Sequence, residues 1–150
     1  MKLSSSEARA RFAAARVARL ATVSADGVPH LVPVTFAVRD DVVVFAVDHK
    51  PKSSVALRRL RNIAENPAVC FLADGYDEDW ARLWWARADG TARVLSDADR
   101  AEPVSWLVAK YAQYAERPPE HAVVVADVRM WSGWAGPSRG GTSPGGARRR

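Results

Sequence analysis

The feature that most constrains the fold is an Asp26-Gly27 pair between two apolar runs. Asp-Gly supplies the positive φ angles of tight hairpin turns, so residues 17–24 and 28–38 are predicted to be antiparallel neighbours. The second run is apolar at almost every position, which predicts that both of its faces are covered. Pro29 and Pro33 cannot donate to a strand ladder, so this strand should also contain bulges or have a partly free side.

The remaining patterns place helices between strands. A capping box at Ser4-Ser5-Ser6-Glu7 predicts a helix to about residue 16. Further strands are predicted over residues 42–47, 68–73, 83–95 and 122–131, and further helices over residues 53–65 and 97–115. Because hairpins dominate and helices do not follow every strand, the order argues against a doubly wound α/β sheet. It favours a mostly β fold, an antiparallel barrel with covering helices.

Three local details belong to this prediction. Asp89-Gly90 should form a bulge inside its strand, and Pro103 should break or restart its helix. In the last strand, the side chains expected to face inward alternate along the sequence. They are Val124, Ala126, Val128 and Met130.

The composition fits one domain followed by a tail. A chain of 150 residues can bury a core as a single unit, which we assign to residues 1–134. Residues 135–150 are rich in Gly, Pro and Arg and are predicted to be disordered. Of the net charge of +5, four arginines of this tail account for +4, which leaves +1 for the body. The body contains no nucleic-acid-binding motif, so no nucleic-acid partner is expected.

Several classes of chemistry lack their residues. Cys70 is the only cysteine, which excludes a disulfide within the chain and a cysteine-pair zinc site, and suits a reducing cytosol. The histidines His30, His49 and His121 show no ligand spacing, so no metal site is expected. No apolar run reaches the ~20 residues of a membrane span, and no signal-peptide core follows Lys2. Nucleophile-elbow, P-loop and dinucleotide fingerprints are also absent, so hydrolysis is disfavoured.

A phosphate-binding segment is suggested by Asp48-His49-Lys50-Pro51-Lys52-Ser53-Ser54. It precedes a predicted helix, whose first turn carries unpaired N–H groups and partial positive charge. Lysines and a serine hydroxyl beside such a terminus are well suited to a phosphate. The alternative is a basic surface loop with an ordinary serine cap. The apolar strands before the segment and the aromatic clusters after it favour a phosphate-bearing aromatic cofactor.

The sequence resembles the pyridoxamine-phosphate-oxidase-like split-barrel flavoproteins. The opening residues 18–30 and 32–36 carry the resemblance, as do Lys50, Lys52, Ser53 and the Asn66-Pro67 helix end. A narrower group, the actinobacterial branch assigned to the deazaflavin coenzyme F420, is suggested by four further motifs. They are Asp48-His49-Lys50-Pro51-Lys52, Leu60-Arg61-Asn62-Ile63, Tyr76-Asp77-Glu78-Asp79-Trp80 and Leu83-Trp84-Trp85-Ala86-Arg87. The resemblance spans about residues 4–134.

This resemblance implies an FMN-binding-type split β-barrel that forms a homodimer with two cofactor sites at the interface. In it Lys50, Lys52 and Ser53 would hold the phosphate, with His49 and Pro51 in the same segment. The strand around Pro33, Val34 and Thr35 would lie along the ring system. Trp80, Trp85 and Arg87, from the same or the partner chain, would wall the site. Arg58 or Arg61 could meet the acidic tail of F420.

The implied function is a cytoplasmic oxidoreductase that uses reduced F420 to deliver hydride to an unsaturated small organic substrate. An FMN-dependent enzyme and a non-catalytic cofactor-binding or carrier protein remain alternatives. The proton donor is not assigned; water and His30 are the candidates. Trp84 and Trp85 are adjacent in a strand and face opposite sides, so only one can line the site. Arg58, Arg59 and Arg61 also fit a solvated helix face.

Overall fold

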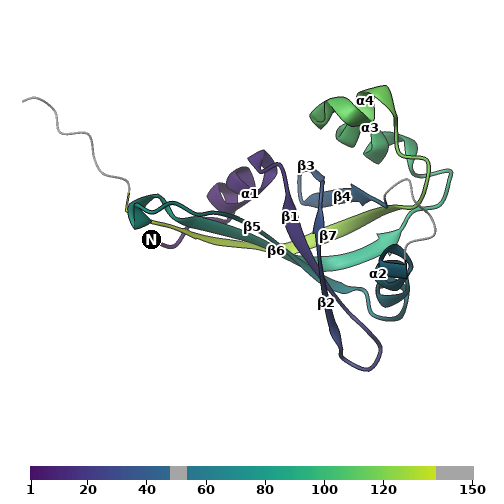
Figure 1. Cartoon of the computed structure of the whole chain (residues 1–150), viewed down its shortest axis with the longest axis horizontal. Coiled ribbons are helices and arrows are strands. Elements are labelled where there is room, and N and C mark those ends of the chain that lie inside the picture. The colour runs from purple at the N-terminus through teal and green to yellow at the C-terminus, as the bar shows by residue number, and fades with distance from the viewer. Residues whose placement is uncertain (48–53, 138–150) are drawn as a thin grey trace, which may run out of the picture.

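A single antiparallel sheet organises the chain. The structure is a computed structural model, which describes residues 1–47 and 54–137, except the side chains of residues 54–57. Its seven strands follow the order β2-β1-β5-β6-β7-β4-β3, and they curl into a half-barrel (Figure 1). The strands are β1 (Ala18–Val23), β2 (Pro29–Val34), β3 (Ala37–Arg39), β4 (Val42–Ala46), β5 (Ala68–Gly75), β6 (Trp84–Val94) and β7 (Val123–Ala135). The helices are α1 (Ser5–Ala14), α2 (Ser54–Glu65), the short 3-10 turn η1 (Trp80–Arg82), α3 (Ala101–Lys110) and α4 (Ala112–Glu116). The predicted mostly β, antiparallel architecture is confirmed.

The predicted hairpin is present, but its second strand is shorter and less covered than expected. Gly27 has a φ of 82°, and the Ser24 N–H donates to the Val28 carbonyl at 3.0 Å, which closes the turn between β1 and β2. The run over residues 28–38 divides into β2 and β3. As an edge strand, β2 has one backbone edge without a partner strand. One of its faces is also uncovered, where Leu31 is 67% exposed. The prediction of a partly free side was right, and the prediction of two covered faces was wrong.

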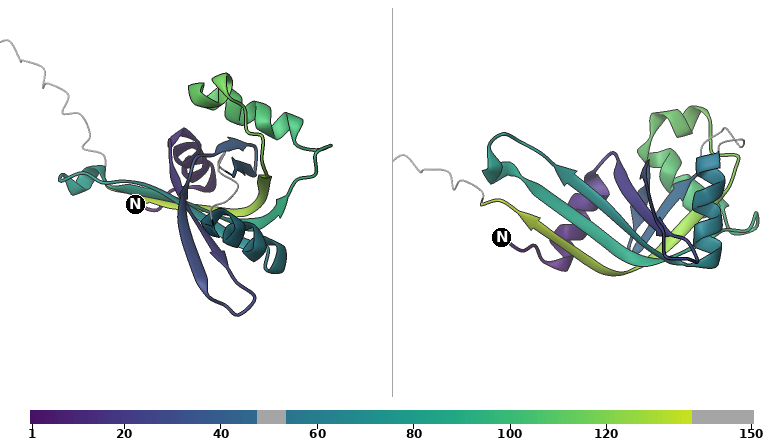
Figure 2. Two further views of the ribbon diagram at one scale, coloured as in Figure 1. Left: turned by 45° about the vertical axis from the view of Figure 1, so that its right-hand side comes forward. Right: turned by 60° about the horizontal axis from the view of Figure 1, so that its bottom comes forward.

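The strand covered on both faces is β4 instead. Val43 and Phe45 belong to one core, which packs between the sheet, α1 and α2. Val44 and Ala46 belong to a second core, formed with α3 and the residues that follow it. Figures 1 and 2 show α1 over one part of the curled sheet, and α3 and α4 over its β3–β4 end.

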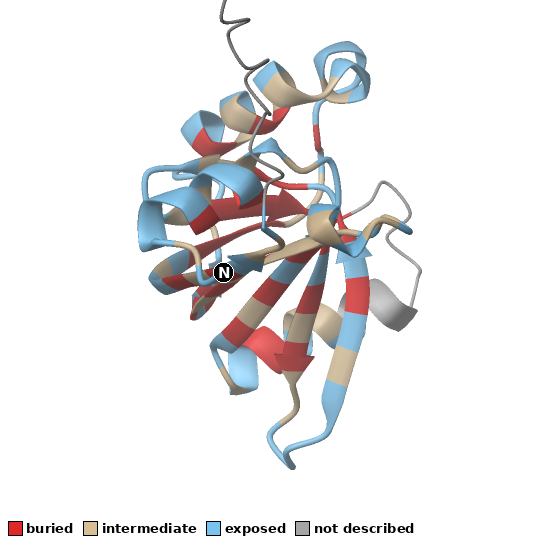
Figure 3. Ribbon diagram, turned by 90° about the vertical axis from the view of Figure 1, so that its left-hand side faces the viewer, coloured by how far each residue is buried: buried red, intermediate tan, exposed pale blue. Residues whose placement is uncertain are grey.

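The bulge predicted at Asp89-Gly90 is confirmed, and it changes which residues of β7 face inward. Asp89 pairs with Met130 and Gly90 pairs with Val128, so Arg129 is an extra residue on β7. One extra residue reverses the alternation of faces beyond it. Trp131 is therefore buried, and Met130, which we expected inside, is 50% exposed. Figure 3 shows the resulting alternation of buried and exposed bands along the strands.

The helical prediction was right at α1 and wrong about Pro103. Ser4 and Glu7 form the expected capping box, although α1 ends at Ala14 rather than near residue 16. Pro103 lies in the first turn of α3, where a missing N–H removes no intrahelical bond. The break occurs at Tyr111, which is extended (φ −118°, ψ 121°) between α3 and α4. On α2, Ile63 is buried and Ala64 is exposed, and the fully buried Asn62 donates to the Thr22 hydroxyl at 3.1 Å.

The tail boundary can be compared only in part. Ala135 is the first residue that the sequence analysis assigned to the tail, and it pairs with Trp84 inside the sheet. The Gly136 N–H donates to the Leu83 carbonyl at 2.8 Å, which extends the ordered pairing by one more residue. Residues 138–150 lie outside the described residues, so disorder in the tail stays a prediction. Among the helices that the structure does describe, none is both long and apolar enough to cross a bilayer.

A half-buried lysine joins the end of α1 to the end of α3. The Lys110 ammonium donates to the carbonyls of Ala13 (3.1 Å) and Ala15 (2.7 Å) and lies 3.8 Å from the centre of the Phe36 ring. Burial, with a smaller contribution from Arg16, lowers the pKa of Lys110 to about 8. The charged form therefore carries a desolvation cost in the folded protein that it does not carry in the unfolded chain.

We expect Gly90→Ala to destabilise the fold by about 3 kcal/mol. A Cβ at this position would overlap the Asp127 carbonyl of β7, and a backbone group cannot move aside as a flexible side chain can. Gly27→Asn is the matched control. Its Cβ meets open space, and asparagine tolerates a positive φ better than most residues, so we expect a smaller loss of about 1 kcal/mol, which comes from the backbone conformation alone. Urea unfolding of both variants measures the two values. Equal stabilities would contradict the close approach of the β6 and β7 backbones.

The free energy of unfolding should rise with pH between about 8 and about 9.5. In that window Lys110 is protonated in the unfolded chain, where its ordinary pKa is 10.5, and is losing its proton in the folded protein. The unfolded state then binds more protons, so stability increases with pH. The Cys70 thiol acts in the opposite direction from about pH 9, because burial raises its pKa above 9.0 in the folded protein, and the buried Tyr111 hydroxyl does so above about pH 10. Both contributions are the same in a variant that lacks only Lys110. Denaturant unfolding of Lys110→Met should show a flatter profile, and an unchanged slope would exclude Lys110 as its origin.

Candidate functional site

The candidate site is a cavity of about 500 Å³ at the end of the sheet where β2 and β4 finish. Its size is within the usual range for small-molecule pockets. Three structural units form its walls: the end of β2, the helix α2, and α4 with its flanking residues. The residues that line it are Pro33, Val34, Thr35, Ala46, Arg59, Tyr111, Gln113, Tyr114 and Arg117.

The lining combines an apolar strip with positive charge. Pro33, Val34 and Ala46 supply the apolar surface, and Arg59 and Arg117 supply two guanidinium groups from different walls. Arg59 lies over the Phe45 ring at 5.8 Å. No carboxylate is among the described residues that line the cavity, so the donor set suits an anionic group on a flat apolar molecule. The described residues also contain no group of three or more His, Cys, Asp or Glu placed to hold a metal ion.

Two tyrosines fix the α4 wall against the end of β2. The Tyr111 hydroxyl donates to the Arg16 carbonyl at 2.9 Å and accepts from the Phe36 N–H at 3.1 Å. The Tyr114 hydroxyl lies 3.1 Å from the Thr35 hydroxyl. Burial is the main cause of the raised pKa of Tyr111. The Tyr111 hydroxyl therefore stays protonated and forms hydrogen bonds with backbone groups. Tyr114, whose hydroxyl contacts the Thr35 hydroxyl, lines the cavity.

The sequence suggested two groups of site residues: those of the strand around Val34 and the lysine segment, and a second group of Trp80, Trp85 and Arg87. The structure places described residues of the first group at the cavity. Pro33, Val34 and Thr35 all line the cavity, as the resemblance implied for the strand along the ring system. On α2, Arg58 is exposed, and the neighbouring Arg59 is the arginine that lines the cavity. The segment with His49, Lys50, Pro51, Lys52 and Ser53 lies outside the described residues. The described chain on either side of it reaches the cavity through Ala46 and Arg59.

His30 lies away from the cavity. It pairs with Thr22 across β1 and β2 and is half-buried on the face that Val32 and Val34 share, toward α2. Burial, together with the charges of Arg58 and Arg59, lowers the pKa of His30 below its ordinary 6.5. His30 is therefore not placed among the described groups that could donate a proton directly into the cavity.

The second group lies near the start of β6. Trp80 is in η1 and is 69% exposed, and Trp85 is the second residue of β6. Arg87 forms an ion pair with Asp89 at 2.9 Å, and its guanidinium lies 5.7 Å from the Trp85 ring centre. Arg87 shares a row of the sheet with Pro33, through Leu72 and Arg19, at three strand spacings or roughly 14 Å. Neither tryptophan nor Arg87 is among the described residues that line the cavity.

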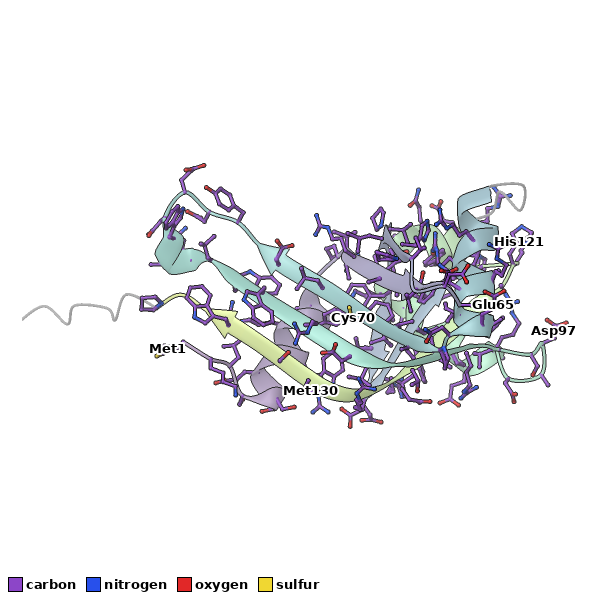
Figure 4. All side chains as sticks on the ribbon, turned by 90° about the horizontal axis from the view of Figure 1, so that it is seen from below. Met1, Glu65, Cys70, Asp97, His121 and Met130 are labelled. Carbon is purple, nitrogen blue, oxygen red and sulfur yellow. The ribbon has the colours of Figure 1, made fainter. Side chains whose placement is uncertain are left out.

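The same end of the sheet presents an uncovered apolar surface, which we call the open face. Trp85 pairs with Trp134, and Arg87 pairs with Leu72 and Ser132, so these residues share one side of the sheet. Figure 4, seen from below, shows Cys70 and Met130 on this side, with α1 behind the strands. Leu31 is 67%, Met130 50%, Leu72 38% and Trp134 36% exposed. An apolar surface of this extent is typical of a site that binds another molecule.

The residues of the α4 wall were not identified from the sequence. Tyr111 was interpreted as part of an apolar helical stripe, and Gln113, Tyr114 and Arg117 were assigned no role. Their positions depend on the helix break at Tyr111, which is held by two hydrogen bonds to residues distant in sequence. The Arg117-Pro118-Pro119 end of the helix was the only local indication that the chain turns there.

Known structures share this fold. An FAD-binding protein from Mycobacterium smegmatis is 24% identical, with a TM-score of 0.62, over 89% of this chain and 96% of its own. An FAD-binding protein from Mesorhizobium loti is 21% identical, with a TM-score of 0.65, over 89% and 95%. A heme-binding protein from M. smegmatis is 20% identical, with a TM-score of 0.70, over 91% of this chain and 56% of its own. No functionally curated protein has a matching sequence.

The sequence match and the fold both indicate a split-barrel protein. The curled antiparallel sheet and its covering helices are those of the solved split-barrel structures. The family described as Pyridoxamine 5'-phosphate oxidase matches residues 4–135, nearly the whole described chain. The chain belongs to the Pyridoxamine 5'-phosphate oxidase family.

Proposed function

We propose that this protein is an oxidoreductase that uses reduced coenzyme F420 to transfer hydride to an unsaturated small organic substrate. The observation that carries the proposal is the cavity at the end of β2. There the apolar strip of Pro33 and Val34 meets Arg59 and Arg117 with no lining carboxylate. An aromatic cofactor with an acidic side chain has both features that such a surface binds. The F420-type motifs around the lysine segment and the double tryptophan favour the deazaflavin over a flavin.

The protein's part in the reaction is binding and positioning. The bound deazaflavin would supply two electrons as hydride when it meets an acceptor. Pro33, Val34 and Thr35 would bind along the ring system, and Lys50, Lys52 and Ser53, with His49 and Pro51, would hold the phosphate. Arg58 or Arg59 on α2 would neutralise acid groups beyond the phosphate. Since His30 does not line the cavity, water is the stronger candidate for the proton that follows.

A flavin-dependent enzyme is the second candidate function. It is favoured by the solved structures of the same fold that are described as FAD-binding proteins. A non-catalytic binding protein is the third candidate. It is favoured by the heme-binding protein of the same fold, and by the absence of an assigned proton donor among the residues that line the cavity. The expectation of a cytosolic protein, drawn from the single cysteine, remains a prediction.

We further propose that two copies of this chain form the functional unit. Trp80 and Trp85 are not among the described residues that line the cavity, so a partner chain is a means by which they could complete a site. The open face supplies an apolar surface for such a partner, which includes Leu72 and Trp134, with the Arg19–Asp74 and Arg87–Asp89 ion pairs on the same part of the sheet. A twofold axis would place each open face against its own copy.

Cofactor choice is tested by titrating the apo-protein in parallel with F420 and FMN, following cofactor fluorescence. We expect low-micromolar binding of F420 and weaker binding of FMN. Replacing Lys50 and Lys52 together by alanine should abolish phosphate-dependent binding, since each charge-assisted bond is worth roughly one or two decades. Arg148→Ala with Arg149→Ala removes the same charge from the tail and should leave binding unchanged. Preference for FMN would move the function to the flavin branch, and unchanged affinity of the lysine variant would remove the proposed phosphate anchor.

The two-copy proposal predicts that Leu72→Glu yields a monomer with weakened cofactor binding, because a charge at the open face would be buried without a partner. Light scattering after size-exclusion chromatography measures the mass, and the cofactor titration measures the site. Val94→Glu is a matched control, because Val94 is similarly exposed (43%) but lies at the other end of β6. A wild-type monomer that binds cofactor fully would contradict the shared site.

A further inference from the structure

We infer that the α4 wall of the cavity is an anion-binding subsite centred on Arg117, which selects a ligand group bearing a carboxylate or phosphate. This subsite would add an anion-recognition role to the proposed function. Only the identity of the ligand, as cofactor or co-substrate, rests on that proposed function. The subsite itself depends on the described residues alone. Of its residues, Gln113, Tyr114 and Arg117 were assigned no role from the sequence.

The charge of Arg117 is available to a ligand. Arg117 directly follows α4 and is exposed. Its backbone N–H donates to the Gln113 carbonyl, and its side chain forms no hydrogen bond or ion pair with the residues that the structure describes. Its neighbour Glu116 is exposed and does not line the cavity. The five-donor fork of a guanidinium matches the two oxygens of a carboxylate or phosphate, and a charge without a competing partner binds such a group most strongly.

The surroundings of Arg117 add polar groups that complement an anion. Gln113 is one turn earlier on α4, and it can donate through its amide. Tyr114 and Thr35 form a hydroxyl pair at 3.1 Å in which either oxygen can be the donor, so the pair can direct one O–H into the cavity. Arg59 contributes a second guanidinium from α2, and the described lining holds no acidic residue beside Arg117.

The wall is held in place independently of any ligand. The Tyr111 hydroxyl bonds to the Phe36 N–H and the Arg16 carbonyl, which ties the start of α4 to two other parts of the chain. The Arg16 guanidinium lies 4.7 Å from the centre of the Tyr111 ring and its Nη2 donates to the Lys110 carbonyl at 3.1 Å. Because the wall is already ordered before a ligand binds, binding costs little conformational entropy, which favours recognition of a small acid.

The test compares an unsaturated acid with its neutral counterpart. Isothermal titration of the apo-protein with cinnamate and cinnamamide, which differ only in the anionic group, should show at least about tenfold tighter binding of the acid. Arg117→Met should reduce this ratio to within about twofold, and Arg117→Lys should retain part of it. Arg93→Met removes an equally exposed arginine from a different hollow and should leave the ratio intact. Thermal unfolding confirms that each variant is folded.

Competition then identifies the source of the anion. If FMN displaces cinnamate and riboflavin does not, the subsite holds the cofactor phosphate; if cofactor and cinnamate bind together, it holds a co-substrate acid. For F420 the matched competitor is the deazaflavin chromophore without its phosphate tail. Equal binding of acid and amide, or an unchanged ratio in Arg117→Met, would overturn the inference even if the cofactor binds. Acid selectivity without binding of any cofactor would instead sustain the subsite and contradict the proposed function.

Discussion

The pairing of β6 with β7 is the interaction on which the rest of the structure depends. It extends from Trp84–Ala135 at one end of the sheet to Val94–Val124 at the other. The sheet continues outward from it, through β5 on one side and β4 on the other. The register shift at Asp89 and Gly90 lies inside this ladder and decides which side chains face each core. One end of the ladder lies beside the cavity residue Ala46, which pairs with Val123, and the other end carries Trp85.

The connection from β6 to β7 supplies the polar wall of the cavity. After β6 the chain forms α3, stops at Tyr111, and forms the short α4 before returning as β7. A helix of five residues has little stability of its own, so its position depends on tertiary contacts. Tyr111 and Tyr114 provide these contacts at Phe36, Arg16 and Thr35, all of which follow α1 or β2. The site therefore brings together segments about eighty residues apart.

Local chemistry explains what could be predicted from the sequence. The Ser4–Glu7 capping box, the Asp26-Gly27 turn and the Asp89-Gly90 bulge each depend on neighbouring residues, and each was predicted correctly. The exposure of Met130 and the break at Tyr111 depend on partners far along the chain, namely β6 and Phe36, which no local pattern records. The site divides in the same way: Pro33, Val34 and Thr35 were found from their motif. Arg117 and Tyr114 belong to the cavity only because the fold brings α4 against β2.

The position of β2 at the edge of the sheet has a consequence for how the protein behaves at high concentration. Two of the six residues of β2 are prolines, and a proline nitrogen cannot donate to an added strand. A foreign strand aligned along this edge would find an interrupted row of donors, so the edge is a poor template for intermolecular β-sheet growth. The hairpin can thus leave its edge exposed to solvent, with a conspicuously apolar sequence, and still be protected against fibrillar self-association.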